Sequence, residues 1–366
     1  MQRPKRYALA IELTAFCNQK CGYCYNDFRD DPQSVGSLPR EELLHLVDRA
    51  LTEVDFDHVT LTGGEPFARP EVFEILEIVA RHGKRAIIIS NGGLITAEHA
   101  ERLASLPVHF VQITLNGPTA DLHEEHVGPG HFEPTLRGIR ALLARGVGVA
   151  GSIVVTRKNA RAVGATLTVL RDLGVKEVAL SRYSPAGYAA AQVAELLPSR
   201  TELLTALRQA EPFGAAGLRL QVTMPVPPCV IDTRDFPHIT FSSCPIGTEA
   251  QEVALGPRGE LRHCTLHSDS LGDARTTSFA DLVTSAAVAT YRDTTPEFCA
   301  PCPMKATCIG GCGAAAVAIF GRREVDPIVA QHVDDAFAAS LAAARGGSSG
   351  FIPANRLVRR TEPAAT

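Results

Sequence analysis

Six short apolar runs, separated by segments of helical period, limit the possible folds of this chain more than any other feature. The runs are nearly continuous and β-rich, which is typical of strands buried on both faces of a parallel sheet. They are YALAIELT, DHVTLTGG, RAIIISNG, VHFVQITLNG, VGVAGSIVVT and KEVALSRYSPAG, and they lie between residues 7 and 187. We therefore predict six buried parallel strands in the first half of the chain.

Five segments between these runs have the apolar spacing of helices. They are LPREELLHLVDRALTEV, RPEVFEILEIVARHG, TAEHAERLASL, EPTLRGIRALLARG and NARAVGATLTVLRDLG. Strands that alternate with helices form parallel sheets through right-handed crossovers. We predict an α/β fold, a partial (β/α)6 barrel of TIM-like form, over residues 1–190. Glycine and polar residues gather where each run ends, at the rim where barrels place their chemistry.

The composition is that of an ordinary folded enzyme. The chain has 366 residues, 45% hydrophobic and 21% charged, which allows a barrel and a second domain. Its net charge of −4 gives no electrostatic reason to expect a nucleic acid or an anionic membrane as partner. The N-terminal apolar stretch is interrupted by Glu12 and is no signal peptide, and no apolar run reaches spanning length. We expect a cytoplasmic protein.

The ten cysteines fall into two groups on either side of a cysteine-free body. The first group is Cys17, Cys21 and Cys24, and the second is Cys229, Cys244, Cys264, Cys299, Cys302, Cys308 and Cys312. In a cytosolic chain such cysteines are more often metal ligands or reactive thiols than disulfides. Two thiolate-rich regions predict iron–sulfur clusters, whereas the pair in CAPC taken alone favours zinc.

The first group lies in TAFCNQKCGYCYN, just past the first predicted strand. Three thiolates on one loop hold three irons of a [4Fe–4S] cluster and leave the fourth without a protein ligand. This CxxxCxxC spacing, with GGEP (Gly63 to Pro66) after the second strand, resembles the radical S-adenosylmethionine superfamily. The resemblance implies that the open iron binds S-adenosylmethionine and that reductive cleavage gives a 5′-deoxyadenosyl radical, which takes a hydrogen atom from a C–H bond. It also implies an electron donor of the flavodoxin or ferredoxin type.

The same resemblance implies a set of residues that bind S-adenosylmethionine. Gly63, Gly64 and Glu65 correspond to positions at the methionine ammonium. Ser90 and Asn91 of SNG, together with Ser152, correspond to positions at ribose and carboxylate. Tyr23 corresponds to a position near adenine. The ordinary alternative for each is a strand-end turn or a core residue.

The second cysteine group has a spacing of its own. Fourteen residues separate Cys244 from Gly259, Cys264 follows after four more, and Cys299-x2-Cys302-x5-Cys308-x3-Cys312 comes later. This resembles the SPASM domain of anaerobic sulfatase-maturating enzymes and peptide maturases, and implies one or two auxiliary [4Fe–4S] clusters. We therefore divide the chain into the barrel (1–190), a bridging helix and strand (191–228), the auxiliary-cluster domain (229–345) and a mobile tail (346–366).

The chain departs from that pattern at its end, where Val329 stands about where the last cysteine is expected. The arrangement implied by the resemblance joins Cys229 to Cys244, Cys264 and Cys312 in the nearer cluster. Cys299, Cys302 and Cys308 then hold the outer cluster, completed by a group such as Asp326, by water or by nothing. The more ordinary role of Asp326 is to cap a helix.

The chemistry on the substrate has two versions. A net oxidation, such as dehydrogenation or cross-linking, passes one more electron onward and suits a chain of clusters. A redox-neutral epimerisation needs a hydrogen donor, a role open to Cys229, for which the ligand role is favoured. The expected substrate is a ribosomal peptide or a small natural product such as a sugar or aminocyclitol, with Arg182 either binding it or forming a structural ion pair. A non-catalytic iron–sulfur electron carrier is the alternative from another class, and it has no need of GGEP.

Overall fold

One continuous sheet organises the protein, whose computed structural model describes residues 6–334. Within this part of the chain, eleven strands follow the order β11-β10-β9-β1-β2-β3-β4-β5-β6-β7-β8. Their bounds are β1 (Arg6–Glu12), β2 (Phe56–Thr62), β3 (Arg85–Ser90), β4 (Val108–Thr114), β5 (Val149–Val155), β6 (Glu177–Arg182), β7 (Arg219–Val222), β8 (Ile239–Phe241), β9 (Ala250–Leu255), β10 (Glu260–Arg262) and β11 (Ser270–Asp273). The six predicted strands are β1 to β6, and the prediction of a partial parallel barrel is confirmed.

The sheet extends further than the sequence indicates. Strand β7, which is the predicted bridging strand, and β8 continue the parallel series beyond β6. On the other edge β9 pairs parallel with β1, and β10 and β11 follow in antiparallel order. The region after residue 228 therefore adds strands to both edges of the barrel sheet. These strands are three to six residues long, too short to show a clear period.

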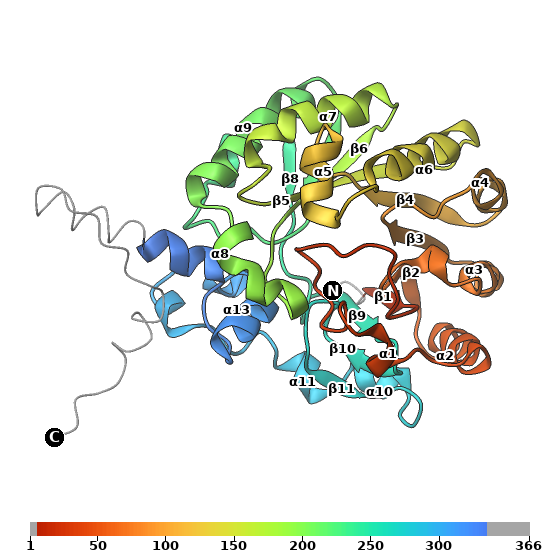
Figure 1. Ribbon diagram of the computed structural model, residues 1–366. Helices are drawn as coiled ribbons and strands as arrows, with labels where there is room; N and C mark the ends of the chain where they lie inside the picture. The colour runs from red at the N-terminus through yellow and green to blue at the C-terminus, as the bar shows by residue number, and fades with distance from the viewer. Residues whose placement is uncertain (1–5, 335–366) are drawn as a thin grey trace, which may run out of the picture.

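Helices cover the outer face of the curved sheet, and the C-terminal segments lie on its open side (Figure 1). The longer ones are α2 (Arg40–Glu53), α3 (Val72–Arg81), α4 (Ala97–Ala104), α5 (Ala120–Val127), α6 (Phe132–Ala144), α7 (Val163–Asp172), α9 (Arg200–Ala215) and α13 (Gly313–Phe320). The shorter ones are α1 (Pro32–Val35), α8 (Val193–Leu196), α10 (Phe279–Val283), α11 (Ala286–Ala289) and α12 (Lys305–Cys308). The five predicted helices and the bridging helix α9 are present, whereas α5 was not predicted. The predicted tail, 346–366, lies outside the described residues.

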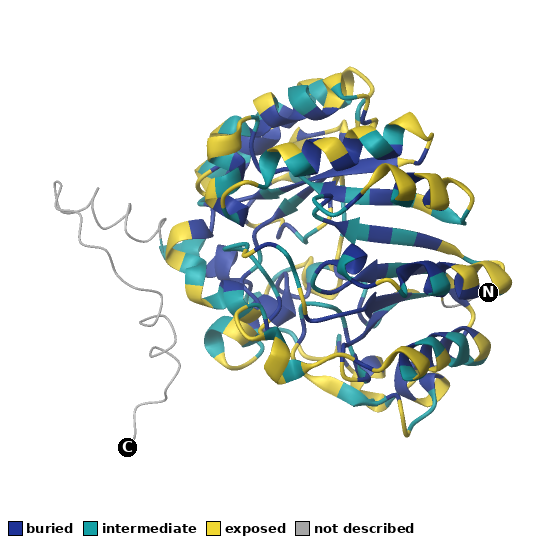
Figure 2. Ribbon diagram, turned by 45° about the vertical axis from the view of Figure 1, so that its right-hand side comes forward, coloured by how far each residue is buried: buried dark blue, intermediate teal, exposed yellow. Residues whose placement is uncertain are grey.

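Burial follows the pattern that the sequence predicts. The strands are largely buried while the outward faces of the helices are exposed (Figure 2). Leu9 and Ile11 of β1 pack in one cluster with Phe73 and Leu76 of α3. Full burial of each such side chain contributes about 1.5–3 kcal/mol relative to exposure. Within residues 6–334, no helix combines the length and the apolar character needed to cross a bilayer.

A buried ion pair joins the barrel to the C-terminal region. Arg182, the last residue of β6, pairs with Asp326, and both side chains are fully buried. The guanidinium also donates to the carbonyls of Pro225 and Tyr183, at 2.9 and 3.1 Å, while Asp326 accepts from the backbone N–H of Cys312 at 2.8 Å. Arg182 thus forms the structural ion pair that was the alternative to substrate binding, and it also lines the cavity. The same contacts argue against Asp326 as a ligand of the outer cluster.

Replacing Asp326 tests this link. We expect Asp326→Ala to lower the free energy of unfolding by about 3–5 kcal/mol, because the change leaves the Arg182 charge buried and unpaired. Urea denaturation of the iron-loaded protein measures the change. The matched control is Asp172→Ala, which removes an exposed pair with Arg171, whose side chains are 61% and 55% exposed, and costs less than about 1 kcal/mol. Equal stability of the two variants contradicts the assigned role of the pair.

Candidate active site

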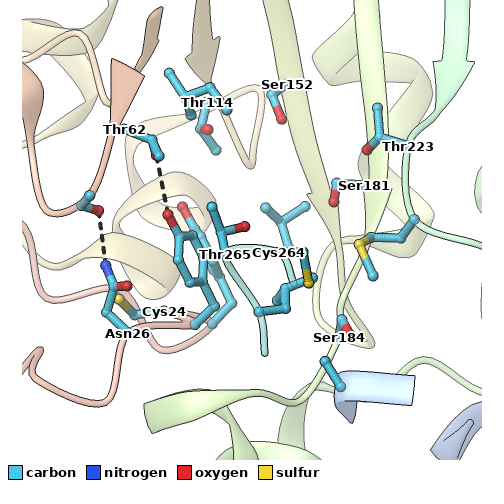
Figure 3. Close-up of a pocket in the computed structure, with 18 of the residues that line it drawn as sticks. Cys24, Asn26, Thr62, Thr114, Ser152, Ser181, Ser184, Thr223, Cys264 and Thr265 are labelled. Carbon is cyan, nitrogen blue, oxygen red and sulfur yellow. Dashed lines mark hydrogen bonds between the residues drawn. The ribbon is translucent and has the colours of Figure 1, made fainter. Parts of the chain in front are cut away.

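A cavity of about 450 Å³ opens at the carboxyl ends of the strands. Hydroxyl groups from successive strand ends surround it, and the close-up labels Thr62, Thr114, Ser152, Ser181 and Thr223 among them (Figure 3). Thr62, Thr114, Ser181 and Thr223 lie at or near the carboxyl ends of β2, β4, β6 and β7, and Ser152 lies within β5. The parallel order of the strands brings these positions together. The chemistry-bearing residues therefore lie at the rim that the sequence predicts.

The loop after β1 presents Cys17, Cys21 and Cys24 to this cavity. The thiol of Cys17 accepts from the backbone N–H of Gln19 at 3.4 Å and from Asn91 Nδ2 at 3.8 Å. Burial raises the pKa of Cys17 to about 11 and also raises the pKa of Cys21 and Cys24, and neighbouring thiols raise the pKa of Cys17 and Cys21 further. The thiols are thus protonated until a metal displaces their protons.

A single metal ion and a four-iron cluster place different demands on the thiols. Among the described residues, no three His, Cys, Asp or Glu side chains are close enough together to hold one metal ion. A zinc site needs four ligands at about 2.0–2.3 Å from the same ion. A four-iron cluster is held by separate thiolates on separate irons. Cys17, Cys21 and Cys24 all line the cavity, and their role as ligands of a [4Fe–4S] cluster stays a prediction.

The stretch from Gly63 to Pro66 clamps this loop by its backbone. The N–H of Gly64 donates to the carbonyl of Thr14 at 2.7 Å, and the N–H of Glu65 donates to that of Phe16 at 2.8 Å. A Cβ at Gly64 would lie 1.9 Å from the Phe16 oxygen, and Gly63 has φ +117°. Only glycine fits this approach. The GGEP motif thereby sets the position of the three cysteines.

Glu65 is buried at the centre of the predicted cofactor site. Its carboxylate accepts from Ser90 Oγ at 2.8 Å, from the N–H of Asn91 at 2.9 Å and from the N–H of Phe67 at 3.2 Å. Burial raises the pKa of Glu65 to about 7, against the lowering effect of these donors. The structure thus brings Ser90 and Asn91 together with Glu65 and shows that they hold its carboxylate, whereas their contacts with the cofactor stay predictions.

The other predicted cofactor residues also line the cavity. Tyr23 lies beside Cys21 and its ring is 6.5 Å from that of His126. Ser152 is buried within β5 and faces the cavity (Figure 3). Their roles toward S-adenosylmethionine stay predictions.

A second set of thiols opens onto the same cavity. We call Cys244, Cys264 and Cys312 the inner group, and all three line the cavity. Cys312 caps α13 by accepting from the N–H of Ala315 at 3.5 Å, and it also accepts from Ser184 Oγ at 3.6 Å. Figure 3 shows Cys24 and Cys264 beside one cavity. The first cysteine group and the inner group therefore share one space, although they are more than two hundred residues apart in the sequence.

Cys229 does not join the inner group, which corrects the expected arrangement. Desolvation of its thiol raises the pKa of Cys229 to about 11, and the charges of Cys308, Cys299 and Cys302 raise it further, so these three thiols are its neighbours. We call these four cysteines the outer group.

The position of Cys229 has a local cause. Pro227 starts the turn that carries Cys229, and a Cβ at Gly311 would lie 3.0 Å from the Pro227 ring. The turn therefore packs against the segment that follows Cys308. Cys229 is exposed and does not line the cavity, so its location also argues against the alternative role of hydrogen donor.

Two further residues of the cavity were not found from the sequence. Glu252 of β9 lines the cavity, and its carboxylate has no hydrogen bond or ion pair within residues 6–334; burial raises its pKa. Tyr291, between α11 and the outer cysteines, lines the inner group. The sequence signal for Glu252 was its place as a lone glutamate in the apolar run QEVAL. No sequence signal marked Tyr291.

Comparison with known proteins agrees with this geometry. Residues 11–170 match the Radical SAM superfamily. The AdoMet-dependent heme synthase of Oleidesulfovibrio alaskensis is 31% identical over 190 residues, 52% of this chain and 48% of that protein. The PqqA peptide cyclase of Ruegeria pomeroyi is 26% identical over 378 residues, 98% of this chain and 97% of that protein.

A solved structure gives the same fold. The protein anSMEcpe, with bound AdoMet and the Cp18Cys peptide, superposes with a TM-score of 0.67 at 19% identity, covering 93% of this chain and 99% of that one. By contrast, the matched part spans about half the length of the heme synthase. The matched residues, 11–170, include the loop of Cys17, Cys21 and Cys24 and strands β2 to β5, so this part of the chain is similar to the Radical SAM superfamily.

Proposed function

We propose that this protein is a radical S-adenosylmethionine enzyme that carries out a net oxidation, a dehydrogenation or a cross-link, on a peptide. The observation that carries the proposal is the single cavity lined by two separate groups of three thiols. A small natural product is the alternative substrate. The peptide is favoured because the PqqA peptide cyclase resembles this chain over 98% of its length, whereas the heme synthase matches only 52% of it.

The residues at the rim have distinct tasks in this proposal. Cys17, Cys21 and Cys24 hold a [4Fe–4S] cluster, and Glu65, oriented by Ser90 and Asn91, faces the cofactor. When bound and reductively cleaved, S-adenosylmethionine supplies the 5′-deoxyadenosyl radical that takes a hydrogen atom from the substrate. The apolar part of the wall keeps water away from the reacting atoms, while the hydroxyl groups of the strand ends hold polar groups of the ligands.

The arrangement of the thiols supports oxidation over epimerisation. Every cysteine that lines the cavity belongs to the first or the inner group, so no free thiol stands ready to return a hydrogen atom. The outer group reaches the surface at Cys229, which is exposed. The three groups thus lead from the cavity to solvent, as the removal of an electron requires. An electron donor of the flavodoxin or ferredoxin type and a cytoplasmic location complete the proposal.

The first prediction concerns the cofactor reaction. The full chain, reconstituted anaerobically and supplied with dithionite, should convert S-adenosylmethionine to 5′-deoxyadenosine and methionine, as measured by chromatography. Cys17→Ala, Cys21→Ala and Cys24→Ala should each abolish the conversion, because each removes a ligand of the open cluster. Cys229→Ala, in the outer group, is the matched control and should retain it. Normal conversion by the triple variant of the first group would falsify the assignment.

A second prediction tests the new grouping of Cys229 by counting iron. The wild type should hold about twelve irons per chain if all three groups carry four-iron clusters. Cys229→Ser and Cys302→Ser should each lower iron content by up to about four atoms, since both remove a ligand of the outer cluster. The double variant should lose no more than either single variant, because the same cluster is affected.

The control for this count is the double variant that combines Cys229→Ser with Cys244→Ser. It affects two clusters, so its loss of iron should be the sum of the losses in the two single variants. If the iron losses are additive for Cys229→Ser with Cys302→Ser, but not for Cys229→Ser with Cys244→Ser, then Cys229 belongs to the inner cluster, as the sequence predicts.

A further inference from the structure

The inner group has only three cysteines, because Cys229 lies with the outer group. A four-iron cluster held there, as the proposed function requires, has one iron without a thiolate. A group that supplies this position must lie beside all three thiols and carry a donor atom that has no other partner. The described residues around the inner group contain one side chain that meets both conditions.

That side chain is Tyr291. It packs in one cluster with Cys244 and Cys264, and a Cβ at Gly313, the residue after Cys312, would lie 2.6 Å from its hydroxyl oxygen. The residue is 8% exposed, lines the cavity and has no hydrogen-bond partner for Oη within residues 6–334. A buried hydroxyl without a partner is unfavourable, so a ligand at this position removes an existing penalty.

Arg323 and His263 contact the ring of Tyr291 and carry polar atoms without partners. The guanidinium of Arg323 lies 4.0 Å from the ring centre, and its Nε and Nη2 atoms have no partner in the described chain. The ring of His263 lies 4.9 Å away, and its Nδ1 atom is equally without a partner. Burial and the three neighbouring thiols raise the pKa of Tyr291, and the charge of Arg323 lowers it. Tyrosine is a known ligand of protein-bound iron.

We propose that Tyr291 binds the fourth iron of the inner cluster through Oη. The Fe–O bond forms as the O–H bond breaks, the proton passes to water, and no electron is transferred. The inference rests on the proposed function only in placing a cluster at the inner group. Glu252 is the competing oxygen donor, since its carboxylate also lines the cavity and acts on Cys264.

Resonance Raman spectroscopy of the reconstituted full chain, with visible excitation, tests the ligand directly. Iron-bound phenolate gives ring vibrations that neither thiolate nor carboxylate ligands produce. We expect these bands in the wild type and their loss in Tyr291→Phe, with iron and sulfide contents unchanged because three cysteines still hold the cluster. Tyr25→Phe is the matched control: Tyr25 also lines the cavity, but its hydroxyl is bonded to Thr62 Oγ1 at 3.1 Å, so the bands should remain.

Two further variants separate the outcomes. Gly313→Ala should weaken the bands while Tyr291 is retained, because the added Cβ displaces the hydroxyl. Cys244→Ala should lower iron content if the inner group holds a cluster. Unchanged iron in Cys244→Ala overturns the inner cluster itself. Iron-loaded wild type without phenolate bands, or bands that survive in Tyr291→Phe, overturns only the tyrosine ligand.

Discussion

The parallel pairing of β9 with β1 is the constraint on which the candidate site depends. It aligns Ile11 with Leu255, so that both strands end at the same rim. The first cysteine loop follows β1 directly, while β10 turns back from β9 and leads to Cys264. Glu12 at the end of β1 then pairs with Arg262 at the end of β10. Two cysteine groups that are far apart in the chain are held on one cavity by this single register.

Burial sets the electrostatic character of that rim. It raises the pKa of Glu12 and of Glu65 to about 7, although Arg262 lowers the first and hydrogen-bond donors lower the second. Burial thus shifts these carboxylates and thiols toward their neutral forms, and a bound cation or metal shifts them back toward the charged forms. The site is therefore prepared for iron and for a cationic cofactor. The ion pair of Arg182 with Asp326 fixes the opposite side, where Asp326 also holds the backbone of Cys312.

The division of the C-terminal thiols follows from packing around Gly311. The turn at Pro227 lies against this glycine, which has φ +93°, and so carries Cys229 to the segment of Cys308. The outer group thereby has four thiols, whereas the inner group keeps three and faces the cavity. In the cluster proposed for the inner group, one iron beside the cavity has no thiolate ligand. The ligand at that iron tunes the charge and the reduction potential of the cluster.

Local patterns in the sequence determined the barrel and the first cysteine loop. The apolar runs of β1 to β6 are long enough to show burial on both faces, and the spacing of Cys17, Cys21 and Cys24 with GGEP lies within short segments whose geometry is nearly local. The glycines of that motif were predicted for the cofactor, and the structure adds their steric role, since a Cβ at Gly64 would meet the Phe16 carbonyl.

Only the tertiary structure decided which C-terminal residues meet. Cysteine spacing does not specify which distant thiols share a cluster, because the partners of Cys229 depend on how one turn packs against Gly311. Strand β9 carries no clear period, so Glu252 could not be placed at the cavity, and Tyr291 lies in a connecting segment without a motif. Arg182 looked available for substrate until its partner Asp326, 144 residues later, was brought beside it. Residues close in sequence constrain one another through backbone geometry, whereas these contacts depend on sheet register and packing, which no single segment contains.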